Sequence, residues 1–334
     1  MFNLDLKKIG QFISNNNFSK ILIQVPEGLL GKPLKRIITI LRNENIDYIV
    51  SGSPIFGMCD LDLNEAKNLN CDAIIHLGHT DFFFKHLLPT ENDTIQVLVI
   101  PVTIDFNINE IVQITLTRLK ELNWNKLGIV TTAQYIDQVN ELIAELRAND
   151  YQIFKKGTGQ ILGCNVNNGN YHSEEIDGIL SITSGNFHSS GLLYQLNHDI
   201  LVIDPINNHQ EVLNLNLREK WIKKRFMITE KAKRGQIFGI LASSKPGQWN
   251  PKEIENVKGI LSSNNKQGIV ITTNTINPEF LLNFTWIDGW INTACPRIAF
   301  EDTERYIKPL ISLKEFYYLF NKLSWDQLIN DGFL

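Results

Sequence analysis

The chain has 334 residues, of which 43% are hydrophobic and 20% are charged, a composition typical of globular proteins. Its formal net charge is −4, so the chain lacks the excess of basic residues that is typical of proteins that bind nucleic acid or anionic membranes. The sequence contains neither a secretory signal nor an apolar stretch long enough to span a bilayer. We therefore expect a cytoplasmic protein without membrane contact and without a direct nucleic-acid partner.

Short β-branched runs alternate with helical patterns along the chain, which predicts parallel α/β units. Three of these runs are each followed by a polar turn. "ILIQV" (21–25) precedes "PEGLLGKP", "LGIVT" (127–131) precedes "TAQY", and "IFGIL" (237–241) precedes "ASSKPGQ". Their similar spacing is long enough for a small domain and indicates an internal repeat.

A second set of runs keeps the same spacing. Asp72, Asp177 and Asp288 each precede a small residue and an apolar strand candidate, with separations of 105 and 111 residues. We therefore predict an α/β fold of three related parallel-sheet domains around a pseudo-threefold axis. The predicted domains are 1–106, 107–212 and 213–334.

The four cysteines form no CxxC pair and lack the spacing of zinc ribbons and ferredoxins. Cys59 and Cys164 each lie 13 residues before the aspartate of their unit, after a strand candidate and a glycine-containing turn. Cys295 instead lies seven residues after its aspartate, at the end of a strand. Cys71 has no counterpart in the other units, so we interpret it as a buried thiol.

Loops that follow the strands of a parallel sheet line its functional edge. If the three edges face one axis, three thiolates converge there, and iron–sulfur clusters prefer thiolate ligands. Three ligands on a 4Fe–4S cluster would leave one iron open to a substrate. The alternative is that all of the cysteines are ordinary core residues.

The segments that carry these residues resemble a known family. "SPIFGMCDLD", "GQILGCNV", "GILASSKPGQ" and "INTACPRIAFED" are similar to the cysteine segments and the third-unit loop of the archaeal diphthamide-biosynthesis enzymes, the 2-(3-amino-3-carboxypropyl)histidine synthases. The resemblance covers nearly the whole chain in order. It implies that a 4Fe–4S cluster lies at the junction of the three domains, held by Cys59, Cys164 and Cys295.

The resemblance also implies a reaction and its partners. S-adenosylmethionine would bind the open iron, and the reduced cluster would break its sulfur–Cγ bond. The resulting 3-amino-3-carboxypropyl radical would add to C2 of a histidine of translation elongation factor 2, the first step of diphthamide biosynthesis. The archaeal enzymes are homodimers, and an electron donor, which the sequence does not identify, is also required. The CxxxCxxC motif of ordinary radical S-adenosylmethionine enzymes is absent.

The loop "SSKPGQ" (243–248) is interpreted either as a surface turn or as a site for the amino acid end of S-adenosylmethionine. In the second interpretation the amine of Lys245 pairs with a carboxylate. Gly28 and Gln134 occupy equivalent positions after the first strands of the other two units, and we expect them to line the same cavity. The candidate binding residues are Gly28, Gln134, Ser243, Ser244, Lys245 and Gly247.

Two further residues are candidates for catalysis. In "HLGHTD" (76–81), alternation places His76 in the sheet and His79 near the cavity, where His79 would be a proton donor, a hydrogen-bonding group or a structural residue. Arg297 would contact the anionic cluster or a substrate carboxylate. Its alternative is an ion pair with Glu301 or Asp302, at the start of a predicted C-terminal helix.

That helix is predicted from the pattern "EDTERYIKPLISLKEFYYLF" (301–320).

The sequence leaves two alternatives to the synthase function. One is a quinolinate synthase-like 4Fe–4S dehydratase, which also has three related domains and three cluster cysteines. The other is a non-catalytic electron-transfer or partner subunit, which is disfavoured because all three cysteines are present.

Overall fold

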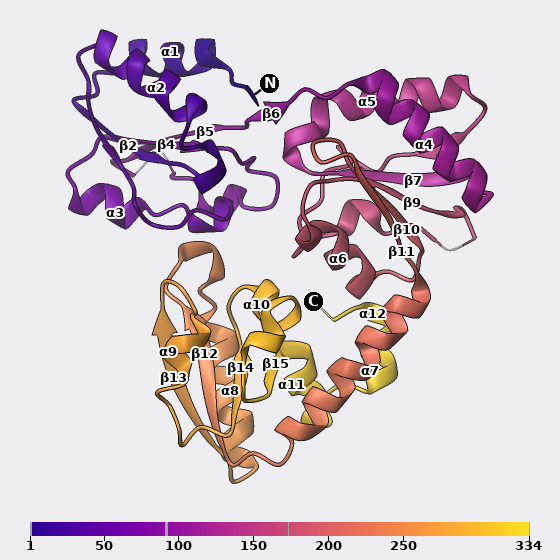
Figure 1. Cartoon of the computed structure of the whole chain (residues 1–334). Coiled ribbons are helices and arrows are strands. Elements are labelled where there is room, and N and C mark those ends of the chain that lie inside the picture. The colour runs from indigo at the N-terminus through magenta and orange to yellow at the C-terminus, as the bar shows by residue number, and fades with distance from the viewer. Residues whose placement is uncertain (1, 91–92, 173, 334) are drawn as a thin grey trace. The chain divides into compact units, whose positions relative to one another are not determined.

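The computed structural model describes residues 2–90, 93–172 and 174–333 (Figure 1). The chain divides into two compact units. Unit 1 comprises Met1–Asn107, Ala133–Glu141 and Lys245–Gly247, and unit 2 comprises Ile108–Thr132, Leu142–Ser244 and Gln248–Leu334. In the part of the chain that the structure describes, no helix is both long enough and apolar enough to cross a membrane.

Unit 1 is built on a four-stranded parallel sheet in the order β3-β2-β4-β5. Its strands are β2 (Lys20–Gln24), β3 (Asp47–Val50), β4 (Ala73–Leu77) and β5 (Gln96–Ile100). A two-stranded antiparallel pair joins β1 (Phe2–Asn3) to β6 (Thr103–Ile104). The helices are α1 (Leu6–Ser14), α2 (Lys32–Asn43) and α3 (Leu63–Asn68). All five residues of β4 are buried, as expected for a central strand covered on both faces.

Unit 2 contains two further sheets. The first has the order β11-β10-β9-β7-β8 and is parallel except for the β10–β11 pair. Its strands are β7 (Lys126–Thr131), β8 (Gln152–Phe154), β9 (Gly178–Ile182), β10 (Ile200–Asp204) and β11 (His209–Leu213). The second is wholly parallel in the order β13-β12-β14-β15. Its strands are β12 (Ile237–Ser243), β13 (Gln267–Thr273), β14 (Gly289–Asn292) and β15 (Leu310–Ser312).

The helices of unit 2 pack on these sheets, and α8, for example, runs alongside β12 and β13 (Figure 1). They are α4 (Ile108–Leu122), α6 (Asn186–Gln195), α7 (Leu215–Ala232), α8 (Pro251–Ser263), α9 (Pro278–Leu281), α10 (Pro296–Phe300), α11 (Leu313–Leu319) and α12 (Trp325–Asp331). The helix α5 (Ile136–Ala148) begins in unit 1 and ends in unit 2.

The three main sheets repeat one strand order. In each sheet the first strand lies between the second and the third strand of its repeat, and the fourth strand follows the third. This repetition confirms the predicted α/β class with related parallel sheets. The exact domain boundaries and the pseudo-threefold arrangement stay predictions.

The three repeated aspartates have one structural role. Each carboxylate accepts hydrogen bonds from two backbone N–H groups at the start of the first strand of its sheet. The donors are Ser19 and Lys20 for Asp72, Asn125 and Lys126 for Asp177, and Gln236 and Ile237 for Asp288, at 2.6–2.9 Å. The aspartates therefore fasten the amino ends of the strands, at the edge opposite the loops that carry the cysteines.

The segment 301–320, predicted to be a single helix, contains a strand between two helical parts, so that prediction is wrong. Leu310 and Ile311 pair with β14 as the outer parallel strand of the third sheet. Ser312 then begins α11, because its hydroxyl accepts the N–H of Glu315 while the Glu315 carboxylate accepts the N–H of Ser312 at 2.7 Å. A helical pattern cannot reveal a three-residue strand of this kind, whose sheet partner is distant in sequence.

Candidate metal centre and adjoining pocket

The Cys59 loop follows β3 in unit 1 and forms one 3₁₀ turn, Met58–Asp60. Met58 and Asp60 are buried, whereas Cys59 is half-buried. Oδ2 of Asp60 accepts hydrogen bonds from the N–H groups of Phe56 and Gly57, at 2.5 and 3.1 Å. The residue after the cysteine thus closes the turn and leaves the thiol at its surface.

The loop 245–247 packs on this turn. Nζ of Lys245 lies 2.5 Å from Oδ1 of Asp60, 3.4 Å from the carbonyl oxygen of Pro54 and 5.0 Å from the centre of the Phe56 ring. A Cβ atom on Gly247 would lie 2.5 Å from Cα of Cys59, so only glycine allows this approach without a shift. Lys245 and Gly247 therefore lie at the Cys59 loop. Because Asp60 already neutralises Lys245, pairing with a substrate carboxylate stays a prediction.

The Cys164 loop in unit 2 is held by α6. The N–H of Gly163 donates to Nδ1 of His188 at 3.1 Å, which fixes a histidine to which the sequence assigned no role. A Cβ atom on Gly191 would lie 2.4 Å from the carbonyl oxygen of Gly163. Helix α6 and the cysteine loop can therefore approach closely only because Gly163 and Gly191 have no side chains.

Cys295 in unit 2 is the residue immediately before α10 and lies three residues after β14. The side-chain amide of Asn292 spans this turn: Nδ2 donates to the carbonyl of Cys295 at 2.9 Å, and Oδ1 accepts the N–H of Ala294 at 3.1 Å. Asn292 is only 4% exposed. Asn292 therefore orients the Cys295 turn. The sequence signal that could have identified Asn292 is its position as a polar residue at the end of an apolar strand.

Arg297 lies two residues after this cysteine. Its Nε atom donates to Oε2 of Glu301 at 3.0 Å, the ion pair given as its alternative role. The side chain of Asp302, the other predicted partner, lies outside the described residues. The guanidinium carbon also lies 5.4 Å from the centre of the Phe187 ring. That ring approaches the space above Gly163, so Phe187 links Arg297 to the Cys164 loop.

The two cysteines of unit 2 interact electrostatically. Burial, followed by the neighbouring Cys295, raises the pKa of the Cys164 thiol to about 12. Two adjacent thiolates are thus disfavoured without a cation, and a bound metal reverses this balance because it stabilises the deprotonated form. Cys164 and Cys295 are half-buried, so their donor atoms suit a thiolate-ligated cluster.

Cys59 belongs to unit 1, whereas Cys164 and Cys295 belong to unit 2, where they are electrostatic neighbours. Cys71 is 4% exposed, and burial raises the pKa of its thiol, in keeping with its interpretation as a core residue. Within residues 2–90, 93–172 and 174–333, no three His, Cys, Asp or Glu side chains are grouped so as to hold a metal ion.

A pocket of about 410 Å³ lies in unit 1. It brings together three residues predicted from different parts of the sequence: Gly28 after β2, His79 after β4, and Gln134 in the segment after β7. Apolar side chains supply much of the remaining wall: Phe2, Leu29, Ile55, Phe56, Val102 and Ile104. Sites for small organic molecules are usually lined in this way, by mainly apolar side chains and a few polar groups.

The remaining candidates, Ser243 and Ser244, lie in unit 2 at the end of β12. Ser243 is 1% exposed. The hydroxyl of Ser244 is hydrogen-bonded to Oδ1 of Asn274.

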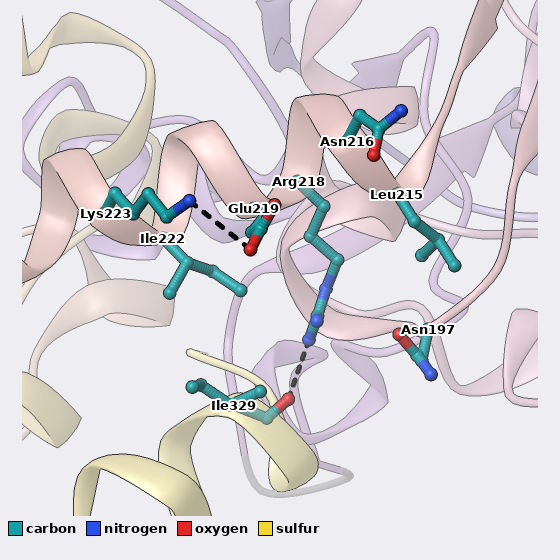
Figure 2. Close-up of a pocket in the computed structure, with 8 residues that line it drawn as sticks. All are labelled: Asn197, Leu215, Asn216, Arg218, Glu219, Ile222, Lys223 and Ile329. Carbon is teal, nitrogen blue, oxygen red and sulfur yellow. Dashed lines mark hydrogen bonds and ion pairs between the residues drawn. The ribbon is translucent and has the colours of Figure 1, made fainter.

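A second pocket, of about 530 Å³, lies beside α7 in unit 2 (Figure 2). Arg218 projects into this region, but its guanidinium donates to the carbonyl groups of Leu193 and Ile329, at 3.1 and 2.7 Å. The pairing of Lys223 with Glu219 at 3.3 Å neutralises the other cation (Figure 2). Arg218 therefore joins α7 to the C-terminal helix, and this pocket contains none of the predicted site residues.

Three comparisons with known proteins give one answer. The chain is 31% identical over 318 residues to the 2-(3-amino-3-carboxypropyl)histidine synthase of Pyrococcus horikoshii, covering 93% of this chain and 86% of that protein. It is 29% identical over 351 residues to the protein of the same name from Methanocaldococcus jannaschii, covering 100% and 95% of the two chains. The crystal structure of Dph2 from Pyrococcus horikoshii with a 4Fe-4S cluster matches with a TM-score of 0.85 and 27% identity, over 100% of this chain and 95% of that chain.

A family model described as "Putative diphthamide synthesis protein" matches residues 25–329. This match confirms the resemblance inferred from the cysteine segments, and it does not favour the quinolinate synthase-like alternative. Since the match extends over most of the chain and includes all three cysteine loops, the chain belongs to the diphthamide synthesis protein family.

Proposed function

We propose that this chain is a 2-(3-amino-3-carboxypropyl)histidine synthase that carries out the first step of diphthamide biosynthesis in the cytoplasm. It transfers the 3-amino-3-carboxypropyl group of S-adenosylmethionine to C2 of a histidine. Diphthamide synthesis implies a protein substrate, which we take to be translation elongation factor 2, and we propose that the enzyme is a homodimer. The supporting observation is that three partly exposed cysteines follow strands of three equivalent sheets in a member of this family.

In this proposal Cys59, Cys164 and Cys295 hold a 4Fe–4S cluster and leave one iron open. When bound and reduced, the cluster supplies the electron that splits the sulfur–carbon bond of S-adenosylmethionine. The chain's own residues bind and orient the substrates and exclude water from them. The S-adenosylmethionine site would comprise Gly28, Gln134, Ser243, Ser244, Lys245 and Gly247.

Two side chains are proposed to act on the reacting groups. The cation of Arg297, two residues from Cys295, would attract the carboxylate of the aminocarboxypropyl group. His79, which lines the pocket of unit 1, would handle the proton exchanged at the target histidine. In the structure Arg297 makes the ion pair with Glu301 that was its alternative role, and His79 is hydrogen-bonded to His76.

The decisive experiment uses anaerobically purified protein, reduced with dithionite and incubated with S-adenosylmethionine and elongation factor 2. We expect methylthioadenosine and an elongation factor heavier by one aminocarboxypropyl group, detected by mass spectrometry. If reduced protein that contains the cluster yields neither product, the proposed function is wrong.

The ligand assignment is tested separately by the iron and sulfide content of the purified protein. Cys59→Ala, Cys164→Ala and Cys295→Ala should each lower this content and the brown colour. Cys71→Ala is the matched control, since it removes a thiol that lies in the core. An unchanged iron content in any of the first three variants would remove that residue from the ligand set.

A further inference from the structure

Two arginines on the buried face of α7 differ in how their charge is balanced. Arg225 is fully buried, and its guanidinium forms a bidentate ion pair with Glu315. Its remaining N–H groups donate to the carbonyl groups of Ala299 and Leu310 and to the hydroxyl of Thr303. A guanidinium has five N–H groups, and all five of Arg225 thus have a partner. This is how a purely structural arginine is satisfied in this helix.

Arg218, about two turns earlier in α7, is 5% exposed and has no carboxylate partner among the described residues. Nε donates to the carbonyl of Leu193 at 3.1 Å, and Nη2 donates to the carbonyl of Ile329 at 2.7 Å. The other three N–H groups make no hydrogen bond with the part of the chain that the structure describes, and Nη1 is not enclosed by it. Carbonyl groups are neutral, so the charge of Arg218 is removed from water without a compensating charge.

A buried charge of this kind is unfavourable. Burial lowers the pKa of Arg218, and no charged neighbour opposes that effect. An arginine stays protonated near neutral pH, so it cannot avoid the cost by losing its proton. Buried charges in proteins are normally paired with an opposite charge. Arg218 is therefore a cation that an anion from outside the chain would complete.

The pocket beside α7 gives such an anion a place next to Arg218 (Figure 2). Its volume is about 530 Å³, which is within the usual range for sites that bind small molecules. Leu215, Ile222 and Ile329 supply apolar side chains to its wall. The pocket thus combines an unpaired cation with an apolar surface, and this combination suits an organic anion better than a simple inorganic ion.

The charge of the pocket selects among organic anions. Lys223 and Glu219 pair with each other at 3.3 Å, so Arg218 supplies the one net positive charge of the lining residues. A singly charged anion balances it, whereas a phosphate monoester carries close to two negative charges near neutral pH. A carboxylate is also planar and accepts two parallel hydrogen bonds from a guanidinium. The amides of Asn197 and Asn216 line the same pocket and offer both donors and acceptors to the rest of the molecule (Figure 2).

We propose that the pocket beside α7 binds a small organic carboxylate, which pairs with Arg218 and packs its apolar part on Leu215, Ile222 and Ile329. The site lies in unit 2 and contains none of the residues assigned to the cluster or to S-adenosylmethionine. The inference therefore goes beyond the proposed function and does not depend on it. The bound carboxylate would supply the charge that Arg218 lacks and stabilise the junction of α6, α7 and α12.

The first test compares 4-methylpentanoate with its neutral amide, 4-methylpentanamide, as matched ligands. Saturation-transfer NMR and thermal unfolding of the full-length, anaerobically purified protein measure binding, because a ligand of the folded state raises the unfolding temperature. We expect saturable binding of the carboxylate with a Kd on the order of 1 mM. The amide should bind at least about tenfold more weakly, because it lacks the charge-assisted hydrogen bonds. Equal binding of the two ligands, or no saturable binding of the carboxylate, would overturn the inference.

Inorganic phosphate is the third ligand, since it supplies negative charge without apolar contacts. It should bind at least about tenfold more weakly than 4-methylpentanoate, because it cannot bury the apolar wall of the pocket. Phosphate binding as tight as that of the carboxylate would overturn the assignment to an organic molecule.

Asn216→Asp tests the site without disturbing the buried hydrogen bonds of Arg218. Asn216 is exposed and is the second residue of α7, where an added carboxylate favours the helix. The new negative charge at the pocket should weaken binding of 4-methylpentanoate by at least about tenfold. Asn64→Asp is the matched control, because Asn64 is also exposed and is the second residue of α3, in unit 1. An affinity for the carboxylate that is the same in the two variants would contradict the proposal.

Arg218→Gln removes the cation itself, and circular dichroism establishes whether the variant is folded. We expect the folded variant to bind 4-methylpentanoate and 4-methylpentanamide equally. A folded variant that still prefers the carboxylate would show that another group provides the positive charge, and the assignment to Arg218 would fail. If this variant does not fold, the comparison of Asn216→Asp with Asn64→Asp decides.

Discussion

Nζ of Lys245 lies 2.5 Å from Oδ1 of Asp60, and these side chains are only 12% and 2% exposed. The residues are far apart in the sequence, but the pair attaches the loop after β12 to the turn that carries Cys59. Because both charges are largely removed from water, the pair differs from the surface ion pairs of the chain, in which solvent screens the attraction.

Lys245→Met should therefore destabilise the Cys59 turn, because it leaves the Asp60 carboxylate buried without its cation. We expect a loss of about 3 kcal/mol, at the lower end of the range for breaking a buried pair. The measurement is amide hydrogen exchange in peptides that cover residues 53–61. Lys258→Met, which removes an exposed pair with Glu255, is the control and should change stability by less than about 1 kcal/mol. Equal effects of the two substitutions would contradict the prediction.

Gly247→Ala should lower the iron content of the purified protein. The added Cβ would lie 2.5 Å from Cα of Cys59, and the nearest atoms include backbone that cannot rotate away. Iron and sulfide analysis after anaerobic purification measures the effect. Gly259→Ala in α8 is the control, because a Cβ there meets nothing within 4 Å and alanine favours a helix. If both variants retain the native iron content, the contact at Gly247 is not a constraint on the cluster site.

Asp288→Asn should destabilise the third sheet more at pH 7 than at pH 3. Hydrogen bonds from the N–H groups of Ile237 and Gln236 lower the pKa of Asp288 below its usual value. The folded state therefore binds this proton less readily than the unfolded chain, whose aspartate pKa is about 3.9. The stabilisation is present above that value and is lost as the pH falls through the lower, folded pKa.

Urea unfolding followed by the fluorescence of tryptophan, which includes Trp290 of the same sheet, measures this dependence. The difference in the free energy of unfolding between the native protein and Asp288→Asn should become smaller as the pH falls below about 4. The pKa of Asp72 is lowered in the same way, first by the N–H of Lys20, so Asp72→Asn should show the same pH dependence in unit 1. If the difference in the free energy of unfolding between native protein and variant does not change with pH, the charge of these carboxylates does not contribute to stability.

Arg297→Ala should raise the KM for S-adenosylmethionine by at least about tenfold, since a charge-assisted hydrogen bond contributes about 1.5–3 kcal/mol. Its ion pair with Glu301 is partly exposed, so the free energy of unfolding should change by less than about 1 kcal/mol. Arg305→Ala, which removes a more exposed pair with Glu279, is the control for both measurements. A KM equal to that of the control would reduce Arg297 to a structural residue.

Much of the fold could be predicted from the sequence, because apolar strands and loop residues recur at a fixed spacing. The same repetition identified Cys59 and Cys164 in equivalent loops, and the structure explains why Cys295 is out of step with them: it lies after the third strand of its sheet rather than the second. The repeated aspartates were visible as a pattern, but their function was not. Their partners are backbone N–H groups, which carry no sequence signal.

The polar contacts of the site were less predictable. The Lys245–Asp60 pair joins residues whose proximity depends on strand order, which no local pattern encodes. Asn292 and His188 orient cysteine loops through single hydrogen bonds with the backbone, and a polar residue at a strand end or in a helix has many other possible roles. The strand β15 was missed because three residues cannot establish a period of two.

The residues Lys245–Gly247 belong to unit 1, although the chain on both sides of them belongs to unit 2. A gene fragment that ends at residue 107 would therefore encode a cysteine turn without the three residues that pack against it. Expressed alone, such a fragment should bury Asp60 without its cation and leave a gap where Gly247 meets Cys59. The first cysteine thus depends on a part of the polypeptide that is synthesised much later, after 244 of the 334 residues, so this turn cannot be completed while the first unit alone has left the ribosome.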